Sequence, residues 1–105
     1  LASVLHRLRD RLAPCGHPPL YLSLDIDVLD PAFAPGTGTP EPGGLSSSQV
    51  LSLLEASATL PFIGMDCVEV SPPYDHAQLA STAAATLVWT YLCGQRRRQL
   101  GTTAR

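Results

Sequence analysis

Hydrophobic side chains recur along the chain at spacings that predict three helices. In residues 1–12, leucine and valine fall at every third or fourth position and the arginines lie mostly opposite them, which predicts an amphipathic helix. The serines at 46–48 are expected to cap a second helix that extends through residue 54. Residues 77–92 are rich in alanine and leucine and nearly apolar all round, so the last helix is expected to be buried.

Two further segments have the pattern of strands. Residues 20–29 alternate strictly, which places five apolar side chains on one face and four others on the opposite face: Leu20, Leu22, Leu24, Ile26 and Val28 against Tyr21, Ser23, Asp25 and Asp27. Residues 62–70 predict a second strand, which ends before a Pro-Pro turn. Because strands and helices alternate, the chain is expected to form β–α–β crossovers and a parallel sheet, which makes it an α/β fold.

A stiff loop connects the first strand to the second helix. Residues 30–44 hold four of the ten prolines and four of the eight glycines, which fix some backbone angles and supply tight turns at others. Loops of this length inside a compact domain are usually functional. Asp30, at the start of the loop, is expected to order it by accepting backbone hydrogen bonds.

Composition and charge exclude several classes of protein. The chain has 105 residues, of which 45% are hydrophobic, and its formal net charge is −2. This length supports at most one domain, and the hydrophobic fraction excludes wholesale disorder. The near-balanced charge leaves no electrostatic footprint for nucleic acid, so the arginines at 96–98 are interpreted as a solvated helix end.

The cysteines and the ends of the chain indicate the cellular compartment in which we expect the protein. Three cysteines without a C-x-x-C pair argue against a disulfide framework and favour a reducing compartment, and Cys67 is interpreted as a small buried hydrophobe. No apolar stretch reaches the roughly 20 residues that span a bilayer and no signal-peptide pattern is present, so we expect a soluble chain with no membrane partner. Because it begins with Leu1 rather than methionine, we expect a piece of a longer protein.

Acidic side chains fall at the carboxyl ends of both predicted strands, where chemistry concentrates in parallel sheets. Asp25 and Asp27 can coordinate one ion or two neighbouring ions, and carboxylates favour Mg²⁺, Ca²⁺ or Mn²⁺. Taken alone, an Asp-x-Asp pair also occurs in sugar-nucleotide transferases and phosphatases, or caps a following helix. Glu69 is either a functional carboxylate or a salt-bridged strand end, and His76 either lines a pocket or is an exposed cap.

A longer motif that contains Asp25 and Asp27 favours one of these alternative roles. Residues 23–44 closely resemble the signature S-x-D-x-D-x-x-D-P-x-x-x-P-x-x-G-T-P-x-x-G-G of the ureohydrolases, the family of arginases and agmatinases. The segment Met-Asp-Cys-Val-Glu-Val-Ser-Pro at 65–72, followed by Tyr74 and Asp75, resembles the next segment of that family at the expected distance. The resemblance covers about residues 21–92, and the loop and turn are more similar to agmatinases than to arginases.

The resemblance implies a fold and a set of site residues. The family fold is a three-layer αβα arrangement around a parallel sheet, of which this chain would be the C-terminal βαβα part. Asp25 matches the aspartate that bridges two Mn²⁺ ions and Asp27 the aspartate that binds the second ion. Glu69 matches the glutamate that receives the guanidinium group of the substrate, and Thr39 lies at a loop position of the substrate pocket.

The sequence also departs from the family. Two further motifs, G-G-D-H and D-A-H-x-D, supply the remaining histidine and aspartate ligands in the family, and neither occurs here. Residues 1–105 are therefore expected to be a C-terminal fragment, with the motifs in about residues 20–92 and a polar tail at 93–105. The implied reaction is the hydrolysis of a guanidine such as agmatine to urea and an amine, putrescine for agmatine. No catalytic set is complete, so the chain is expected to be inactive alone.

Alternatives remain open at this point. The substrate can be another guanidine, such as guanidinobutyrate, a proclavaminate-type compound or arginine. The chain can also be a non-catalytic truncated protein that associates with full-length subunits, or an unrelated acidic metal-binding domain. Family resemblance further implies a homo-oligomer, a trimer or hexamer, in the complete protein. The cytoplasm is the default compartment, with the mitochondrion as the alternative.

Overall fold

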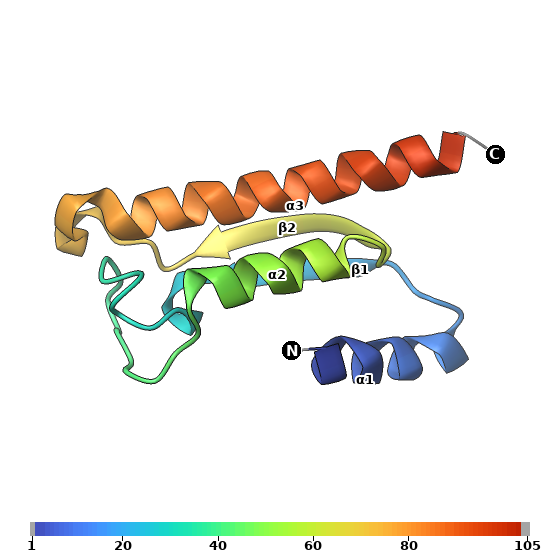
Figure 1. Ribbon diagram of the computed structural model, residues 1–105, viewed down its shortest axis with the longest axis horizontal. Coiled ribbons are helices and arrows are strands. Elements are labelled where there is room, and N and C mark those ends of the chain that lie inside the picture. Colours follow the sequence, from blue (N-terminus) through green and yellow to red (C-terminus); the bar gives the residue numbers. More distant parts are fainter. Residues whose placement is uncertain (1, 104–105) are drawn as a thin grey trace.

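Two parallel strands and three α-helices make up the chain in the computed structural model, which describes residues 2–103 (Figure 1). The elements follow the order α1 (Ala2–Leu12), β1 (Leu20–Asp25), α2 (Ser47–Ser57), β2 (Phe62–Val68) and α3 (Leu79–Thr103). Short 3-10 turns lie at Ala13–Cys15, Ile26–Val28, Pro72–Tyr74 and His76–Gln78. The predicted alternation of helices and strands is confirmed.

β1 pairs with β2 in parallel, and α2 forms the crossover between them. The register places Ser23 opposite Asp66, Leu24 opposite Cys67 and Asp25 opposite Val68. Both strands therefore end at the same edge of the sheet, as the α/β prediction requires.

All three helices pack on one face of this sheet. Leu24 joins Val50 and Leu54 of α2 and Leu87 of α3 in one buried cluster. A second cluster joins α1 to the sheet and α3 through side chains from every helix and both strands: Leu5, Leu12, Leu60, Phe62 and Tyr91, with Leu20, Leu22, Leu53 and Met65 partly buried against them. Burial of these apolar side chains holds the two layers together.

The opposite face of the sheet carries polar side chains. Tyr21 is 61% exposed there. Ser23 is exposed and Asp66, its partner in the register, is half-buried. Among residues 2–103, no helix covers this face. The described part of the chain is a two-layer arrangement.

Both strands are shorter than the alternation predicts. β1 ends at Asp25 because residues 26–28 turn into a 3-10 helix, and the Asp27 amide donates to the Asp25 carboxylate over 3.1 Å. Asp27 therefore does not lie on the strand face, and Val28 is 38% exposed although Ile26 is fully buried. An aspartate that accepts from the amide two residues on competes with the extended conformation, which the hydrophobic alternation does not reveal.

α3 differs from the prediction in its length and its burial. It begins at Leu79 and continues to Thr103, so the polar tail is helical as far as the structure describes it. Trp89 is 68% exposed and Leu92 52% exposed, so the expectation of an all-round buried helix is wrong. The tail packs because the Arg98 guanidinium donates to the carbonyl oxygens of Leu60 and Phe62, each over 2.6 Å.

The other two helices follow their sequence signals. Ser46 caps α2 in a capping box, since its hydroxyl accepts from the Gln49 amide and the Gln49 side chain accepts from the Ser46 amide. α1 buries Leu5 and Leu12, whereas Val4 of the same predicted face is 45% exposed. The predicted contribution of Leu1 lies outside the described residues.

The loop of residues 30–44 is ordered by backbone contacts, as predicted for Asp30. Its carboxylate accepts from the amides of Ala32 and Gly43, each over 2.9 Å, and these bonds hold the pKa of Asp30 below its usual range. The loop closes where Leu45 exchanges backbone hydrogen bonds with residues 28 and 30, each over 2.9 Å.

No helix within residues 2–103 is long and apolar enough to cross a membrane.

Gly44 lies close against the backbone at the start of this loop, and this contact can be tested by substitution. A Cβ atom on Gly44 would lie 2.5 Å from the Asp30 amide nitrogen and 2.8 Å from the Val28 carbonyl oxygen, and neither backbone atom can move freely. We expect Gly44→Ala to lower the free energy of unfolding by about 1–3 kcal/mol. Gly38→Ala is the matched control, because nothing lies within 4 Å of a Cβ there. Equal urea midpoints for the two variants would contradict the close approach.

The lowered pKa of Asp30 gives a second prediction. Because its pKa is lower in the folded than in the unfolded chain, the Asp30 carboxylate stabilises the fold above the pH at which an unfolded aspartate titrates. This contribution is lost as the pH falls through the folded pKa. The gap in urea midpoint between the wild type and Asp30→Asn is therefore expected to be largest near neutral pH and to close as the pH falls through the folded pKa of Asp30. A gap independent of pH would refute the assignment.

Candidate functional site

The predicted site residues lie where the two strands end. Asp25 is the last residue of β1, and Asp27 lies two residues later in the 3-10 turn. Glu69 follows directly after β2, whose last residue, Val68, is opposite Asp25 in the register. The predicted placement of acidic side chains at the carboxyl ends of neighbouring strands is therefore confirmed.

Asp25, Asp27 and Thr39 form one hydrogen-bonded group. The Asp25 carboxylate accepts from the Asp27 amide over 3.1 Å, and the Thr39 hydroxyl donates to Oδ2 of Asp27 over 2.9 Å. Burial raises the pKa of Asp25 above its usual range, and the neighbouring Asp27 carboxylate adds to this effect. The loop thus brings Thr39 back to the end of β1 across twelve residues.

Glu69 has a strained backbone. Its φ of 65° lies in the left-handed region, which costs a residue other than glycine about 1–3 kcal/mol. Its side chain is exposed, and within residues 2–103 it forms no ion pair, so the alternative of a salt-bridged strand end is not supported. A strained, exposed carboxylate at a strand end next to the one that carries two other carboxylates is typical of a functional position.

The carboxylates of Asp25 and Asp27 are suitable ligands for a divalent cation. Carboxylate oxygens are the ligands that Mn²⁺ and Mg²⁺ prefer, and a cation would favour the charged form of Asp25, which burial disfavours. However, residues 2–103 hold no group of three or more His, Cys, Asp or Glu side chains arranged to hold a metal ion. The site as described therefore offers part of a ligand set.

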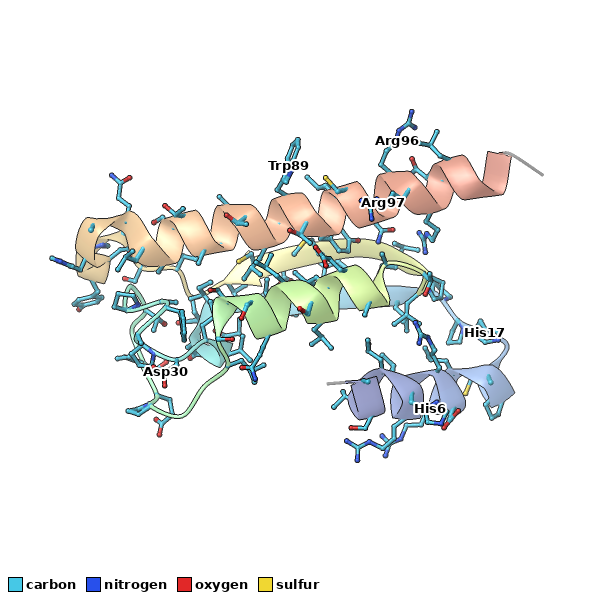
Figure 2. All side chains as sticks on the ribbon, viewed as in Figure 1. His6, His17, Asp30, Trp89, Arg96 and Arg97 are labelled. Carbon is cyan, nitrogen blue, oxygen red and sulfur yellow. The ribbon has the colours of Figure 1, made fainter. Side chains whose placement is uncertain are left out.

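The histidines do not complete this set. Figure 2 shows His6 on α1 and His17 beyond its end, at the opposite end of the molecule from Asp30. His6 pairs instead with Asp10 on the exposed side of α1, over 3.3 Å. His76 is exposed in a 3-10 turn, which agrees with the exposed alternative; its predicted capping role stays a prediction. Cys67 faces the helices and is partly buried, and burial raises the pKa of its thiol, which agrees with its interpretation as a small apolar residue.

The structure gives three further polar residues near the site a role that was not predicted from the sequence: Ser23, Asp66 and Asp75. The Ser23 hydroxyl donates to Asp66 across the strand pair over 2.7 Å, on the uncovered face that also carries Asp25. Asp75 accepts three hydrogen bonds from the start of α3. Its position just before a predicted helix is the usual signal of a cap and could have identified it. The Ser23–Asp66 pair has no such local signal, because it depends on the register.

Comparison with known proteins identifies the family. The family model described as "Arginase family" matches residues 1–94. A solved structure of a hypothetical agmatinase from Burkholderia thailandensis superposes with a TM-score of 0.85 at 45% identity, covering 95% of this chain and 31% of that chain. Arginase-like structures of this kind confirm the predicted fold class.

Curated relatives include proteins with different names. The agmatinase of Neisseria meningitidis serogroup C is 45% identical over 97 residues, which is 90% of this chain and 32% of that protein. The proclavaminate amidinohydrolase of Streptomyces clavuligerus is 52% identical over 85 residues, which is 77% of this chain and 27% of that protein. This chain thus spans about a fifth to a third of the length of the curated relatives it matches.

The signature loop, the two strand ends and the superposition with solved relatives all agree with the match of the family model. The chain belongs to the arginase family.

Proposed function

We propose that this chain is the C-terminal part of a manganese-dependent ureohydrolase, which hydrolyses a small guanidine to urea and an amine. The observation that carries the proposal is the group at the strand ends: two adjacent carboxylates, a hydroxyl bonded to one of them, and a strained carboxylate after the neighbouring strand. The names of the agmatinase relatives support agmatine as the substrate, with putrescine as the amine product.

The two aspartates are assigned to the metal ions. Asp25 and Asp27 offer oxygen ligands from one turn of backbone, so both carboxylates can face the same cation pair. Bound divalent ions would supply a water molecule of lowered pKa as the nucleophile. Thr39 holds the Asp27 carboxylate in one orientation through its hydrogen bond, which fixes the ligand before a cation binds.

Glu69 is assigned to the substrate. A guanidinium group is planar and presents two parallel N–H donors, which a carboxylate accepts in a bidentate manner. The Glu69 side chain is exposed and projects from a fixed backbone after β2. A carboxylate in this position holds the guanidinium carbon at the edge where the aspartates lie. Thr39, on the facing loop, is the second substrate-binding residue.

The substrate within the guanidine class is the finer part of the proposal. Relatives named agmatinase and proclavaminate amidinohydrolase match this chain at similar identity, 45% and 52%. Agmatine is preferred because the match to the Neisseria agmatinase covers 90% of this chain, against 77% for the proclavaminate amidinohydrolase. The guanidinobutyrate and arginine alternatives differ at the far end of the substrate, which none of the four assigned residues contacts.

A second candidate function is supported by the uncovered face of the sheet. Parallel sheets are normally covered on both faces, whereas all three described helices pack on one face here. The chain would then be a non-catalytic protein that associates with full-length ureohydrolase subunits. We also propose that the complete protein is a trimer or a hexamer. Its proposed compartment is the cytoplasm or the mitochondrion.

The partial ligand set gives a prediction for the chain by itself. Two carboxylates are expected to bind Mn²⁺ weakly, with a dissociation constant on the order of 10⁻³ M, and Asp25→Ala is expected to abolish this binding. We expect no urea release from agmatine. Isothermal titration with MnCl₂ and a urea assay measure both. Urea release that Asp25→Ala abolishes would show that the site is complete within this chain.

A chimera tests the assignment of Glu69. In the agmatinase chimera, this chain replaces its matching segment in the Neisseria meningitidis agmatinase, and we expect manganese-dependent urea release from agmatine. Glu69→Gln removes the charge that pairs with the guanidinium group, so kcat/KM is expected to fall about 100-fold while the manganese content stays unchanged.

Glu55→Gln is the matched control for this experiment, because Glu55 is an exposed residue near the end of α2. Loss of manganese from the Glu69→Gln chimera would contradict the substrate role. A wild-type chimera that folds, binds manganese and releases no urea would refute the proposed function.

A further inference from the structure

The loops that follow β1 and β2 touch where Gly36 lies against Asp75. The Ser71 amide donates to the Gly36 carbonyl oxygen over 2.8 Å. A Cβ atom on Gly36 would lie 2.5 Å from the Cβ atom of Asp75 and 2.6 Å from its Cγ atom, so no space separates the two residues. Gly36 itself is buried. One hydrogen bond and one close contact therefore join the two loops.

Asp75 is fixed in turn to the start of α3. Its Oδ1 atom accepts from the Ala80 amide over 2.8 Å, and its Oδ2 atom accepts from the Ser81 amide over 2.8 Å and from the Ser81 hydroxyl over 2.6 Å. Three donors on the two oxygens of Asp75 hold its carboxylate in one orientation. The amides of the first helical turn have no partner within the helix, so they favour a negative charge nearby. The Asp75 carboxylate thus anchors the second loop to the longest helix of the chain.

Both loops lead from this contact to the candidate site. Thr39 lies three residues beyond Gly36, and its hydroxyl reaches the Asp27 carboxylate over 2.9 Å. Glu69 lies two residues before Ser71, in the left-handed conformation with φ of 65°. The turn between Ser71 and Asp75 is closed by two backbone hydrogen bonds, from Tyr74 to Ser71 and from Asp75 to Pro72, each over 3.0 Å. Backbone hydrogen bonds therefore connect Asp75 to Ser71, which lies two residues from Glu69.

We propose that Asp75 is a positioning residue, which sets where Glu69 lies relative to the carboxylates of Asp25 and Asp27 through its contacts with α3 and Gly36. The substrate side of this inference rests on the proposed function, whereas the contact between the loops is a property of the fold. Asp75 itself acts through Glu69, so the metal ligands keep their places when Asp75 changes.

The competing interpretation is that Asp75 only caps α3. A cap alone stabilises the helix and has no special effect on Ser71 or on the substrate affinity. Two variants separate the interpretations because they reach the contact from opposite sides: Asp75→Asn weakens the anchor on α3, and Gly36→Ala forces the two loops apart. Ser81→Ala is a milder variant that removes one of the three hydrogen bonds of Asp75.

Hydrogen exchange of the 105-residue chain tests the contact without any assumption about activity. The Ser71 amide is expected to exchange at least about tenfold faster in Asp75→Asn and in Gly36→Ala, and a few-fold faster in Ser81→Ala. Thr82→Ala and Gly38→Ala are the matched controls, one on the same helix and one in the same loop, and neither is expected to change Ser71. Unchanged Ser71 exchange in both Asp75→Asn and Gly36→Ala would overturn the inference.

Kinetics of the agmatinase chimera test the consequence for the substrate. Asp75→Asn and Gly36→Ala are expected to lower kcat/KM by about 10–100-fold with a raised KM for agmatine and an unchanged manganese content, because Glu69 is displaced. Ser81→Ala keeps the test decisive if the stronger variants unfold, with an expected rise in KM of a few-fold.

The outcomes separate this inference from the function on which it depends. An unchanged KM in all three variants, with faster Ser71 exchange, would reduce Asp75 to a structural cap and overturn the positioning role. Loss of manganese from the variants would also overturn it, since the aspartates would then have moved. An inactive wild-type chimera would instead refute the proposed function, and the positioning role with it. Faster hydrogen exchange of the Ser71 amide in the variants would still show that the two loops are in contact in the fold.

Discussion

β1 and β2 run parallel over six paired residues, and this pairing decides where every site residue lies. A parallel pair requires a crossover, which α2 and its preceding loop supply, and it brings both carboxyl ends to one edge of the sheet. Asp25 thereby lies opposite Val68, and Glu69 follows at the same edge. A slip of one residue would exchange the two faces of β1 and place Leu24 in water, so burial of the apolar face enforces this register.

Hydrogen bonds and close contacts to the backbone order the loops at this edge. Asp30 and Gly44 close the first loop on itself, and Asp75 ties the second loop to α3. Left-handed residues concentrate in the second loop, at Glu69, Ala77 and Gln78. The hydrogen bonds of Asp75 to the first turn of α3 offset part of this strain, which allows Glu69 to keep a conformation that a free loop would leave.

The incomplete sheet and the incomplete ligand set have a common origin. The chain corresponds to 31% of the Burkholderia agmatinase chain, so most of that fold has no counterpart in it. One face of the sheet is left to Tyr21, Ser23 and Asp66, and the ring of Tyr21 lies 3.0 Å from where a Cβ atom of Gly64 would be. Asp25 lies on this same face. Elements that covered the face would approach the aspartates from the open side, which is where the proposed metal site would take further ligands.

The sequence by itself determined the order of elements, the parallel sheet, the cap of α2 and the ordering role of Asp30, because each depends on local periodicity or on hydrogen bonds between near neighbours. Its motifs also identified the family and the acidic strand ends. The early end of β1 depends on the hydrogen bond from the Asp27 amide to Asp25, which is local but leaves no mark in the hydrophobic alternation. The left-handed conformation of Glu69 and the helical tail depend on the tertiary structure. Arg98 holds the tail by donating to the carbonyl oxygens of Leu60, before β2, and of Phe62, in β2. Ser23 contacts Asp66 only because the strand register places them opposite each other. Such contacts join residues about forty positions apart, and a local pattern of hydrophobic and polar residues carries no information about them.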